Sequence, residues 1–212
     1  MTEQSKVFET HYQDYCRRIG RCDLGAAAEI LGLVPEEQGG WIRFLNRDYW
    51  VSGEGFRDDS GRRPGYGLCV ILAKYVLLCP DRVIRDPQWV GIRDFKKDAA
   101  ITNVNFFTSD TEQAILKHFQ SRTDRMELAG QALAGKPHDT GAGYDLSMVF
   151  DLLPRIRLLL LFNDKDEGFP AMCRVLFEKH AEFYLDPESL VMCGSALARS
   201  LISSDREAGH ED

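Results

Sequence analysis

One stretch, residues 152–170 with the sequence LLPRIRLLLLFNDKDEGFP, constrains the fold of this chain more than any other. It begins with alternating polar and apolar residues and becomes fully apolar from Leu158 to Phe162. A short apolar run can be a strand buried on both faces, and its length and the preceding Pro154 favour a strand over a helix. We therefore predict a central strand of a sheet here, which leads directly into an acidic turn.

Other segments predict strands that could share this sheet or form another. Leu146, Met148 and Phe150 alternate with polar residues, and residues 173–177 (CRVLF) form a second short apolar run. Residues 40–53 predict a β-hairpin, because aromatic and β-branched residues flank the turn residues 46–48. Residues 87–95 predict a short strand that enters a turn. Gly53–Gly67 is rich in glycine and charge, which predicts a long loop, either a mobile linker or a functional lid.

The N-terminal half also predicts helices. Apolar residues at helical spacing run through residues 5–33, and Gly20 divides them into two helices, the second of which stops at Gly32. Residues 68–78 (LCVILAKYVLL) are apolar nearly all round, so we expect a helix buried at the centre of the domain. Lys74 within it is expected to extend its head to solvent, with a catalytic lysine as the alternative.

Two further helices are predicted in the second half. Ser109 and Glu112 match a capping box, so a helix is expected to open there and to run to about residue 134, with a break near Ser121. Asp186 as N-cap and Pro187 at the first helical position predict the start of the last helix.

Together these elements predict an α+β fold: an antiparallel or mixed sheet packed against several helices. A chain of 212 residues is long enough for one domain with a substantial core, which we place at residues 1–203. Residues 204–212 have almost no apolar content and are expected to form a disordered tail.

Composition excludes some function classes. The net charge of −7 argues against a nucleic-acid binder, which needs a basic face to neutralise phosphates. No apolar run approaches the roughly 20 residues needed to span a bilayer, and the polar N-terminus lacks the apolar core of a signal peptide. We therefore expect a cytoplasmic protein.

The six cysteines do not form a recognisable metal motif. None belongs to a C-x-x-C pair, so neither a zinc site nor an iron–sulfur cluster is indicated, and no cofactor can be named. We expect free thiols, and those in apolar stretches are expected to be small buried hydrophobes: Cys69, Cys79, Cys173 and Cys193.

The first candidate site is the acidic turn with Asp164, Asp166 and Glu167. Three carboxylates within four positions could bind a hard cation such as Mg²⁺ or Ca²⁺, although the spacing is not that of an EF-hand. The alternative is a solvated polar turn that follows a buried strand.

Two further candidates are His180 and Asp145. If the strand at residues 173–177 brings His180 beside the acidic turn, the imidazole could transfer protons or bind a metal; the alternative is a histidine with satisfied hydrogen bonds at a strand end. Asp145 follows glycines in GAGYDLS, which could admit a ligand to the backbone, although a simple turn explains them as well.

The order of several short motifs resembles a prokaryotic family defined as a domain of unknown function, number 3786. They are LAKYVL (72–77), GYDLS (143–147), LPRI (153–156), DKDEGFP (164–170), LF (176–177) and YL (184–185). The resemblance spans most of the chain and implies a fold and a prokaryotic, often anaerobic setting, without an activity. Gly168 departs from the compact acid-acid-Phe-Pro turn of the family, and this chain lacks the cysteine-rich segment for which some members are described as iron–sulfur proteins.

We therefore expect a non-catalytic accessory protein that binds a partner protein or a small ligand near Asp164–Pro170. The alternative is a metal-dependent enzyme with an acidic and histidine-containing site near Asp164–Glu167.

Overall fold

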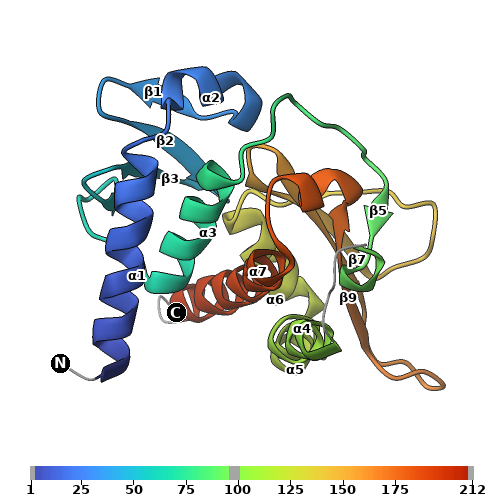
Figure 1. Ribbon diagram of the computed structural model, residues 1–212. Coiled ribbons are helices and arrows are strands. Elements are labelled where there is room, and N and C mark those ends of the chain that lie inside the picture. The colour runs from blue at the N-terminus through green and yellow to red at the C-terminus, as the bar shows by residue number, and fades with distance from the viewer. Residues whose placement is uncertain (1–2, 96–100, 210–212) are drawn as a thin grey trace.

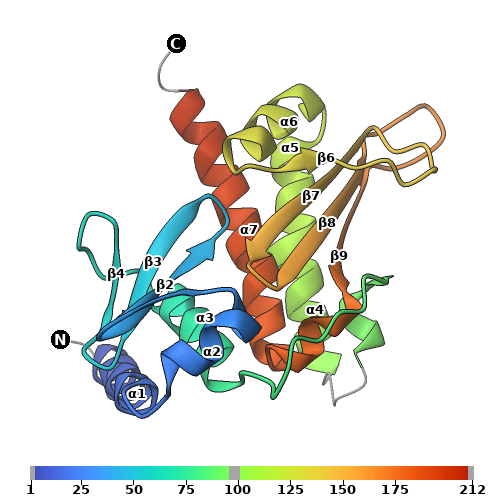
Figure 2. The same ribbon diagram turned by 90° about the horizontal axis from the view of Figure 1, so that it is seen from above.

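The computed structural model describes residues 3–95 and 101–209, which form two antiparallel sheets with helices between and around them (Figures 1 and 2). The first sheet has the order β1-β2-β3-β4 and the second the order β5-β9-β8-β7-β6. The α+β prediction is thus confirmed, with purely antiparallel sheets. The strands are β1 Val34–Glu36, β2 Gly39–Phe44, β3 Arg47–Ser52, β4 Phe56–Asp58, β5 Trp89–Val90, β6 Lys136–Pro137, β7 Leu146–Leu153, β8 Ile156–Asn163 and β9 Met172–Glu178.

The first sheet contains the predicted hairpin. β2 and β3 pair from Gly39↔Ser52 to Phe44↔Arg47, so the turn occupies residues 45 and 46. Leu45 adopts a positive φ of 53° in this turn. The segment predicted as a long loop is partly a strand, because β4 pairs with β3 there. Only the part after β4 remains a connection to the next helix.

Two helices precede this sheet, as predicted: α1 Glu3–Ile19 and α2 Leu24–Leu31. Asp23 caps the start of α2 by accepting a hydrogen bond from the Ala26 N–H at 2.9 Å. Gly32 ends α2 in the left-handed conformation at φ 71°, which glycine adopts without steric cost.

The helix α3 Tyr66–Leu77 is the buried apolar helix that the sequence predicts. Its residues 69–73, with Tyr75 and Val76, are buried. Lys74 reaches solvent at the side of the helix, where its Nζ lies 2.8 Å from Asp186 Oδ2. The lysine is therefore paired and not isolated in the core.

The second sheet has β8 at its centre, as the apolar run predicts. β8 pairs with β7 on one side and with β9 on the other, and Leu158–Phe162 are all buried. One face of this strand packs on the main core and the other, through Leu159 and Leu161, on a small separate cluster. Burial on both faces explains why the alternation of polar and apolar residues disappears.

The segment between β5 and β6 corrects one prediction. α4 Ile101–Phe107, a π-helical turn Thr108–Glu112 and α5 Gln113–Phe119 follow one another directly, so no helix starts at a capping box there. Glu112 is instead buried and accepts a hydrogen bond from the Val175 N–H of β9 at 3.2 Å. The predicted break near Ser121, which has φ 62°, separates α5 from α6 Thr123–Ala132.

The last helix corrects the predicted disordered tail. α7 Pro187–Ala208 begins at the predicted cap, where Asp186 accepts from the Ser189 N–H at 2.8 Å. It continues through residues 204–208, and Asp205 is buried against α5 and α6. Ion pairing, not apolar burial, therefore holds the final turns. None of the described helices is long and apolar enough to cross a membrane.

The two sheets meet at the β2–β3 hairpin. The Leu45 N–H donates to the Leu152 carbonyl of β7 at 2.9 Å, and Asn46 Nδ2 donates to the Ala132 carbonyl of α6 at 2.7 Å. A single hydrophobic cluster includes residues of both sheets. The hairpin turn is thus fixed in position, and cavities open on either side of it.

Candidate ligand-binding groove

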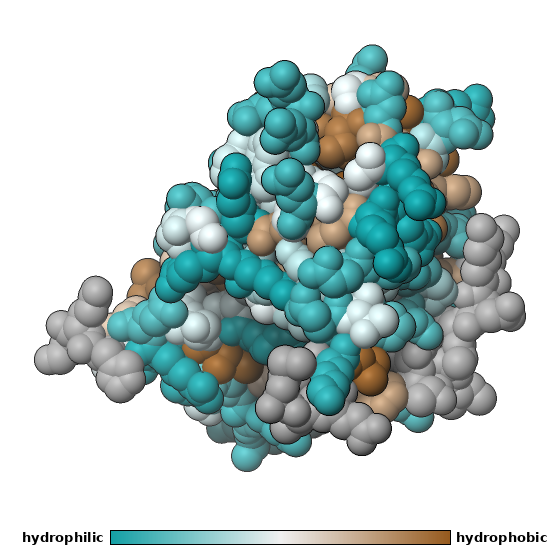
Figure 3. Space-filling model, turned by 60° about the vertical axis from the view of Figure 1, so that its left-hand side comes forward, coloured by the Kyte–Doolittle hydropathy of each residue, from teal (hydrophilic) through white to brown (hydrophobic). Residues whose placement is uncertain are grey.

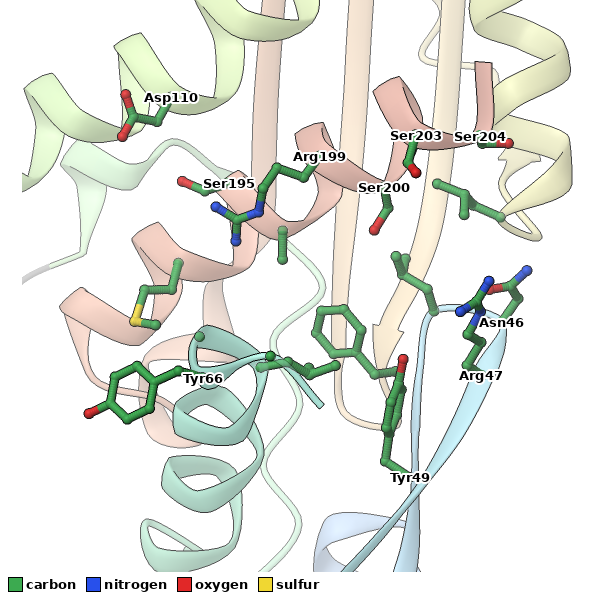
Figure 4. Close-up of a pocket in the computed structure, with 18 of the residues that line it drawn as sticks. Asn46, Arg47, Tyr49, Tyr66, Asp110, Ser195, Arg199, Ser200, Ser203 and Ser204 are labelled. Carbon is green, nitrogen blue, oxygen red and sulfur yellow. The ribbon is translucent and has the colours of Figure 1, made fainter. Parts of the chain in front are cut away.

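A groove of about 860 Å³ lies between α7, the start of α3 and the β2–β3 hairpin; we call it the α7 groove. Figure 4 shows its polar side chains, most of which come from α7 and from the hairpin, with Tyr66 from α3 and Asp110 from the π-helical turn. The space-filling view in Figure 3 shows charged and polar side chains over most of one face of the molecule, with small apolar patches between them. The polar lining residues are Asn46, Arg47, Tyr49, Tyr66, Asp110, Ser195, Arg199, Ser200, Ser203, Ser204 and Glu207.

Helical periodicity gives α7 two chemically distinct faces. Ser195, Arg199 and Ser203, four residues apart, lie on the groove side. The opposite face packs into the core and consists of Leu190, Cys193, Leu197 and Leu201. Serine side chains are short, so this face leaves room for a ligand while still offering hydrogen bonds.

Arg199 lies close to the start of α3. Arg199 Nη2 lies 4.0 Å from the position that a Cβ atom would take at Gly67, in the first turn of α3. The N-cap of this helix is Gly65, so no side chain accepts hydrogen bonds from the first N–H groups. The ring of Tyr66 stacks on Phe8 with centroids 4.3 Å apart, which fixes this end of the helix against α1. The first N–H groups of a helix carry partial positive charge, so they add to the field of the guanidinium.

Arg47 faces the groove from the other side. It starts β3 next to the hairpin turn, which the hydrogen bonds of Leu45 and Asn46 hold in place. Among the side chains that the structure describes (residues 6–95 and 104–209), neither Arg47 nor Arg199 has a carboxylate oxygen within 4.0 Å. Two guanidinium groups therefore face one groove without an ion-pair partner.

The two acidic residues of the lining are engaged with neighbouring hydroxyls. Glu207 accepts from Ser203 Oγ at 3.1 Å, and Asp110 accepts from Ser109 Oγ at 2.7 Å. In the described part of the chain the hydroxyls of Ser200 and Ser204 make no hydrogen bond to protein. The lining is balanced in formal charge: among the described residues Asp110 and Glu207, like the two arginines, have no ion-pair partner, and each carboxylate accepts only from a hydroxyl of its own segment.

This arrangement suits the binding of an anion. Guanidinium groups match carboxylate and phosphate oxygens in geometry, and hydroxyls supply further donors. No described histidine lines the groove, so its serines have no imidazole beside them to act as a base.

The structure brings Asp145 and Asp164 together at the ends of β7 and β8. The Asp164 N–H donates to Asp145 Oδ2 at 2.7 Å, and the Asp145 N–H donates to Asn163 Oδ1 at 3.0 Å. Asp164 in turn accepts from the Ser121 N–H at 2.8 Å and from Thr123 Oγ1 at 3.2 Å, at the start of α6. Both carboxylates thus hold the turns of the sheet and the helix in place.

The pKa of Asp164 reflects this role. Desolvation raises the pKa, but hydrogen bonds from the N–H groups of Ser121 and Lys165 and from Thr123 outweigh it. The net pKa lies below the usual value for an aspartate, so the carboxylate is ionised at neutral pH.

Asp166 and Glu167 lie at the exposed tip of the β8–β9 hairpin. Asp166 and Phe169 exchange backbone hydrogen bonds at 3.1 Å, and the Glu167 N–H donates to Asp166 Oδ1. Phe169 is 77% exposed. Among the described residues, no group of three or more His, Cys, Asp or Glu side chains is placed so that it could hold a metal ion. A partner-binding role of the tip stays a prediction.

His180 does not lie beside the acidic turn. β8 and β9 are antiparallel, so the turn at residues 164–171 joins one end of the hairpin and His180 follows the other end. His180 Nδ1 lies 3.1 Å from the Asp86 N and 2.9 Å from the Asp86 carbonyl oxygen, and Nε2 lies 3.0 Å from the Arg155 carbonyl oxygen. This is the alternative of a satisfied histidine at a strand end.

Sequence reasoning missed the α7 groove. Its local signal is the segment SALARSLISS (195–204), in which small polar residues and one arginine occupy the face opposite the leucines. That pattern is also typical of an ordinary exposed face. Only the tertiary structure shows that α3 and the hairpin turn toward it.

A family model described as "Domain of unknown function (DUF3786)" matches residues 23–200. No curated protein and no solved structure matches the chain.

Proposed function

The chain belongs to the DUF3786 family, whose description carries no activity, and from that premise we propose that it is a binding protein for a small organic anion held in the α7 groove. The observation that carries this proposal is the pair of guanidinium groups, Arg47 and Arg199, that face the groove without a carboxylate partner. The ligand group is a carboxylate or a phosphate, because both present oxygens that a guanidinium binds through two hydrogen bonds.

Placement of the positive charges supports an anion between α7 and α3. Arg199 lies near the uncapped start of α3, where helix N–H groups also point toward an acceptor. Arg47 lines the groove from the hairpin, on the opposite side from Arg199 in Figure 4, so the two arginines suit the two ends of an extended dianion.

The fixed geometry of the walls also supports binding. Asn46 is bonded to α6, Tyr66 is stacked on Phe8, and α7 is packed on the core along its opposite face. Preformed walls avoid the entropic cost of ordering loops when a ligand binds.

A binding role is favoured over catalysis by the same lining. The serine hydroxyls lack an adjacent imidazole, and the two carboxylates accept from hydroxyls of their own segment. No observation favours the metal-dependent enzyme that the acidic turn suggested, so we do not propose it.

Thermal unfolding with inorganic phosphate and with succinate, at constant ionic strength set with sodium chloride, tests the proposal. At a concentration 100-fold above Kd, a ligand that binds only the folded state adds about 2.7 kcal/mol, which raises Tm by about 5–10 °C for a chain of this size. Stabilisation by phosphate indicates a ligand with a phosphate group, and stabilisation by succinate indicates a ligand with carboxylate groups.

The variants Arg47→Gln and Arg199→Gln each remove one charged donor group, and Arg206→Gln on the exposed far part of α7 is the matched control. Loss of a charge-assisted hydrogen bond weakens binding by about 10- to 100-fold. Equal stabilisation of the wild type and of the double variant Arg47→Gln/Arg199→Gln, or no stabilisation of the wild type by either probe, would refute the proposal.

A further inference from the structure

The α7 groove changes character along the axis of the helix. In chain order, the residues of α7 that line it are Val191, Met192, Ser195, Ala196, Arg199, Ser200, Ser203, Ser204 and Glu207. Before Arg199 this lining is apolar apart from one serine, and after Arg199 every lining residue of the helix is polar. An α-helix rises about 1.5 Å per residue, so each half is about 12 Å long. Arg199 therefore stands at the boundary between an apolar half and a polar half of the groove.

Phe106 of α4 extends the apolar half. It lines the groove and is 54% exposed. Its neighbour Phe107 is buried and packs on Gly194 of α7 so closely that a Cβ atom there would clash with the ring. The end of α4 is thus held beside the apolar half. A single exposed phenylalanine needs no explanation, but this one continues the apolar wall that α7 begins.

The start of α3 borders this half from another side. Leu68 lines the groove, and Met192 Cε lies 3.6 Å from the position that a Cβ atom would take at Gly67. The same position is 4.0 Å from Arg199 Nη2. Because glycine has no side chain, a ligand here can contact the methyl group of Met192 and the guanidinium of Arg199 together. Apolar contact and positive charge thus adjoin at one point.

Asp110 favours one direction for a bound anion. It lines the groove four residues after Phe106, and its carboxylate accepts from Ser109 Oγ at 2.7 Å. In Figure 4, Arg199 lies between Asp110 and Arg47. Like charges repel, so an anionic group is favoured on the Arg47 side of Arg199 and disfavoured beside Asp110. The apolar half is therefore left for a part of the ligand that carries no charge.

We infer that the anion of the α7 groove carries a hydrocarbon arm. Its carboxylate or phosphate lies between Arg199 and Arg47, and the arm lies along Val191, Met192 and Phe106. The inference rests on the function proposed above and names the class of its ligand, an amphipathic anion. A purely polar anion would leave the apolar wall in water, and an uncharged hydrocarbon would leave the two arginines without a partner. An apolar lining with a few placed polar groups is the usual form of a small-molecule site.

Calorimetric titration with butanoate, hexanoate and octanoate measures the contribution of the arm, at concentrations below those at which the longer chains aggregate. A methylene that is fully buried tightens binding by about fourfold. The groove is open to solvent, so we expect about half of that free energy, which is about twofold per methylene and about 16-fold between butanoate and octanoate. Inorganic phosphate and hexyl phosphate form a second matched pair. The series that binds more tightly identifies the charged group as carboxylate or phosphate.

The double variant Phe106→Ala/Met192→Ala tests where the arm lies. Phe106 is exposed and Met192 is half-buried, so both side chains can be shortened without opening a cavity in the core. We expect the affinity for octanoate to fall about fivefold or more, toward that of butanoate, and the affinity for inorganic phosphate to stay the same. Leu128→Ala is the matched control, because Leu128 is 64% exposed on α6 and does not line the groove.

The outcomes separate the arm from the anion site itself. The arm is overturned, and the anion site stands, if phosphate or succinate binds the wild type but octanoate binds no more tightly than butanoate and hexyl phosphate no more tightly than phosphate. Octanoate that binds the double variant as tightly as the wild type would overturn the arm too, because the hydrocarbon would then lie elsewhere. If none of these anions binds the wild type, both the arm and the proposed function fail.

Discussion

Asp205→Asn tests whether the end of α7 is an integral part of the fold. The Asp205 side chain is 4% exposed, and its carboxylate lies 2.6 Å from Arg125 Nε and 2.8 Å from His118 Nε2. The amide keeps the size of the side chain but removes its charge. Arg125 then loses its ionic partner across the contact between α6 and α7.

Removing one partner of a buried ion pair typically costs 3–5 kcal/mol. Arg125 is 44% exposed and His118 is 17% exposed, so water can rehydrate the cations that remain. We therefore expect a loss of about 2–3 kcal/mol in the free energy of unfolding, which lowers Tm by about 5–10 °C. Urea denaturation followed by circular dichroism measures this loss, with the exposed Asp59→Asn as control.

The effect should also depend on pH. Desolvation raises the pKa of Asp205, but hydrogen bonds and charge from His118 and Arg125 outweigh it, so the folded-state pKa is lower than the ordinary value. The stability from this group is therefore fully present above the unfolded pKa of about 3.9 and is lost as pH falls through the folded pKa. A difference between Asp205→Asn and wild type below 0.5 kcal/mol at pH 7 would refute an ordered, ion-paired end of α7.

Three further predictions concern the turn, the central strand and the thiols. Asp164→Ala removes the hydrogen bonds from the Ser121 N–H and Thr123 Oγ1 and should cost about 1 kcal/mol in urea denaturation; an unchanged midpoint would contradict a stabilising role of these bonds. Leu160→Ala leaves a cavity at a fully buried position and should cost about 3 kcal/mol, whereas a cost below 1 kcal/mol would place β8 outside the core. A thiol reagent on the native protein should modify the exposed Cys22, while burial raises the pKa of Cys193 and protects it until the chain unfolds; rapid modification of Cys193 in the native state would count against its burial.

The sequence predicted the elements whose signals are local. The length of the apolar run Leu158–Phe162 and the preceding Pro154 favour a strand covered on both faces, and β8 takes that place. Asp186 and Pro187 determine the start of α7 through cap chemistry within one turn. In both cases the chain segment itself contains the groups that define the structure.

Other features depend on residues far apart in the sequence. Glu112 matches a capping box by spacing, but its carboxylate is taken by the Val175 N–H of β9, 63 residues away. The tail prediction failed because Asp205, in a polar segment, is buried by pairing with Arg125 and His118. A prediction from hydrophobicity misses such a residue, because ion pairs offset the cost of burying its charge.

The candidate site residues also divide into those that a local hairpin brings together and those that only distant elements bring together. Asp145 and Asp164 meet because β7 and β8 form a hairpin, but the antiparallel course of β9 carries His180 to the opposite end. The arginines of the α7 groove, Arg47 and Arg199, are 152 positions apart and no local pattern links them. Only the docking of the β2–β3 hairpin on the second sheet brings them to one groove.

Titration of the isotope-labelled protein with inorganic phosphate and with succinate, followed by NMR, shows directly whether an anion binds in the α7 groove. We expect the largest shifts at the backbone N–H groups of Tyr66 and Gly67 and at the guanidinium groups of Arg47 and Arg199, and we expect these shifts to vanish in Arg199→Gln. Shifts that are spread over the surface, or that persist unchanged in Arg199→Gln, would contradict an anion site in the α7 groove.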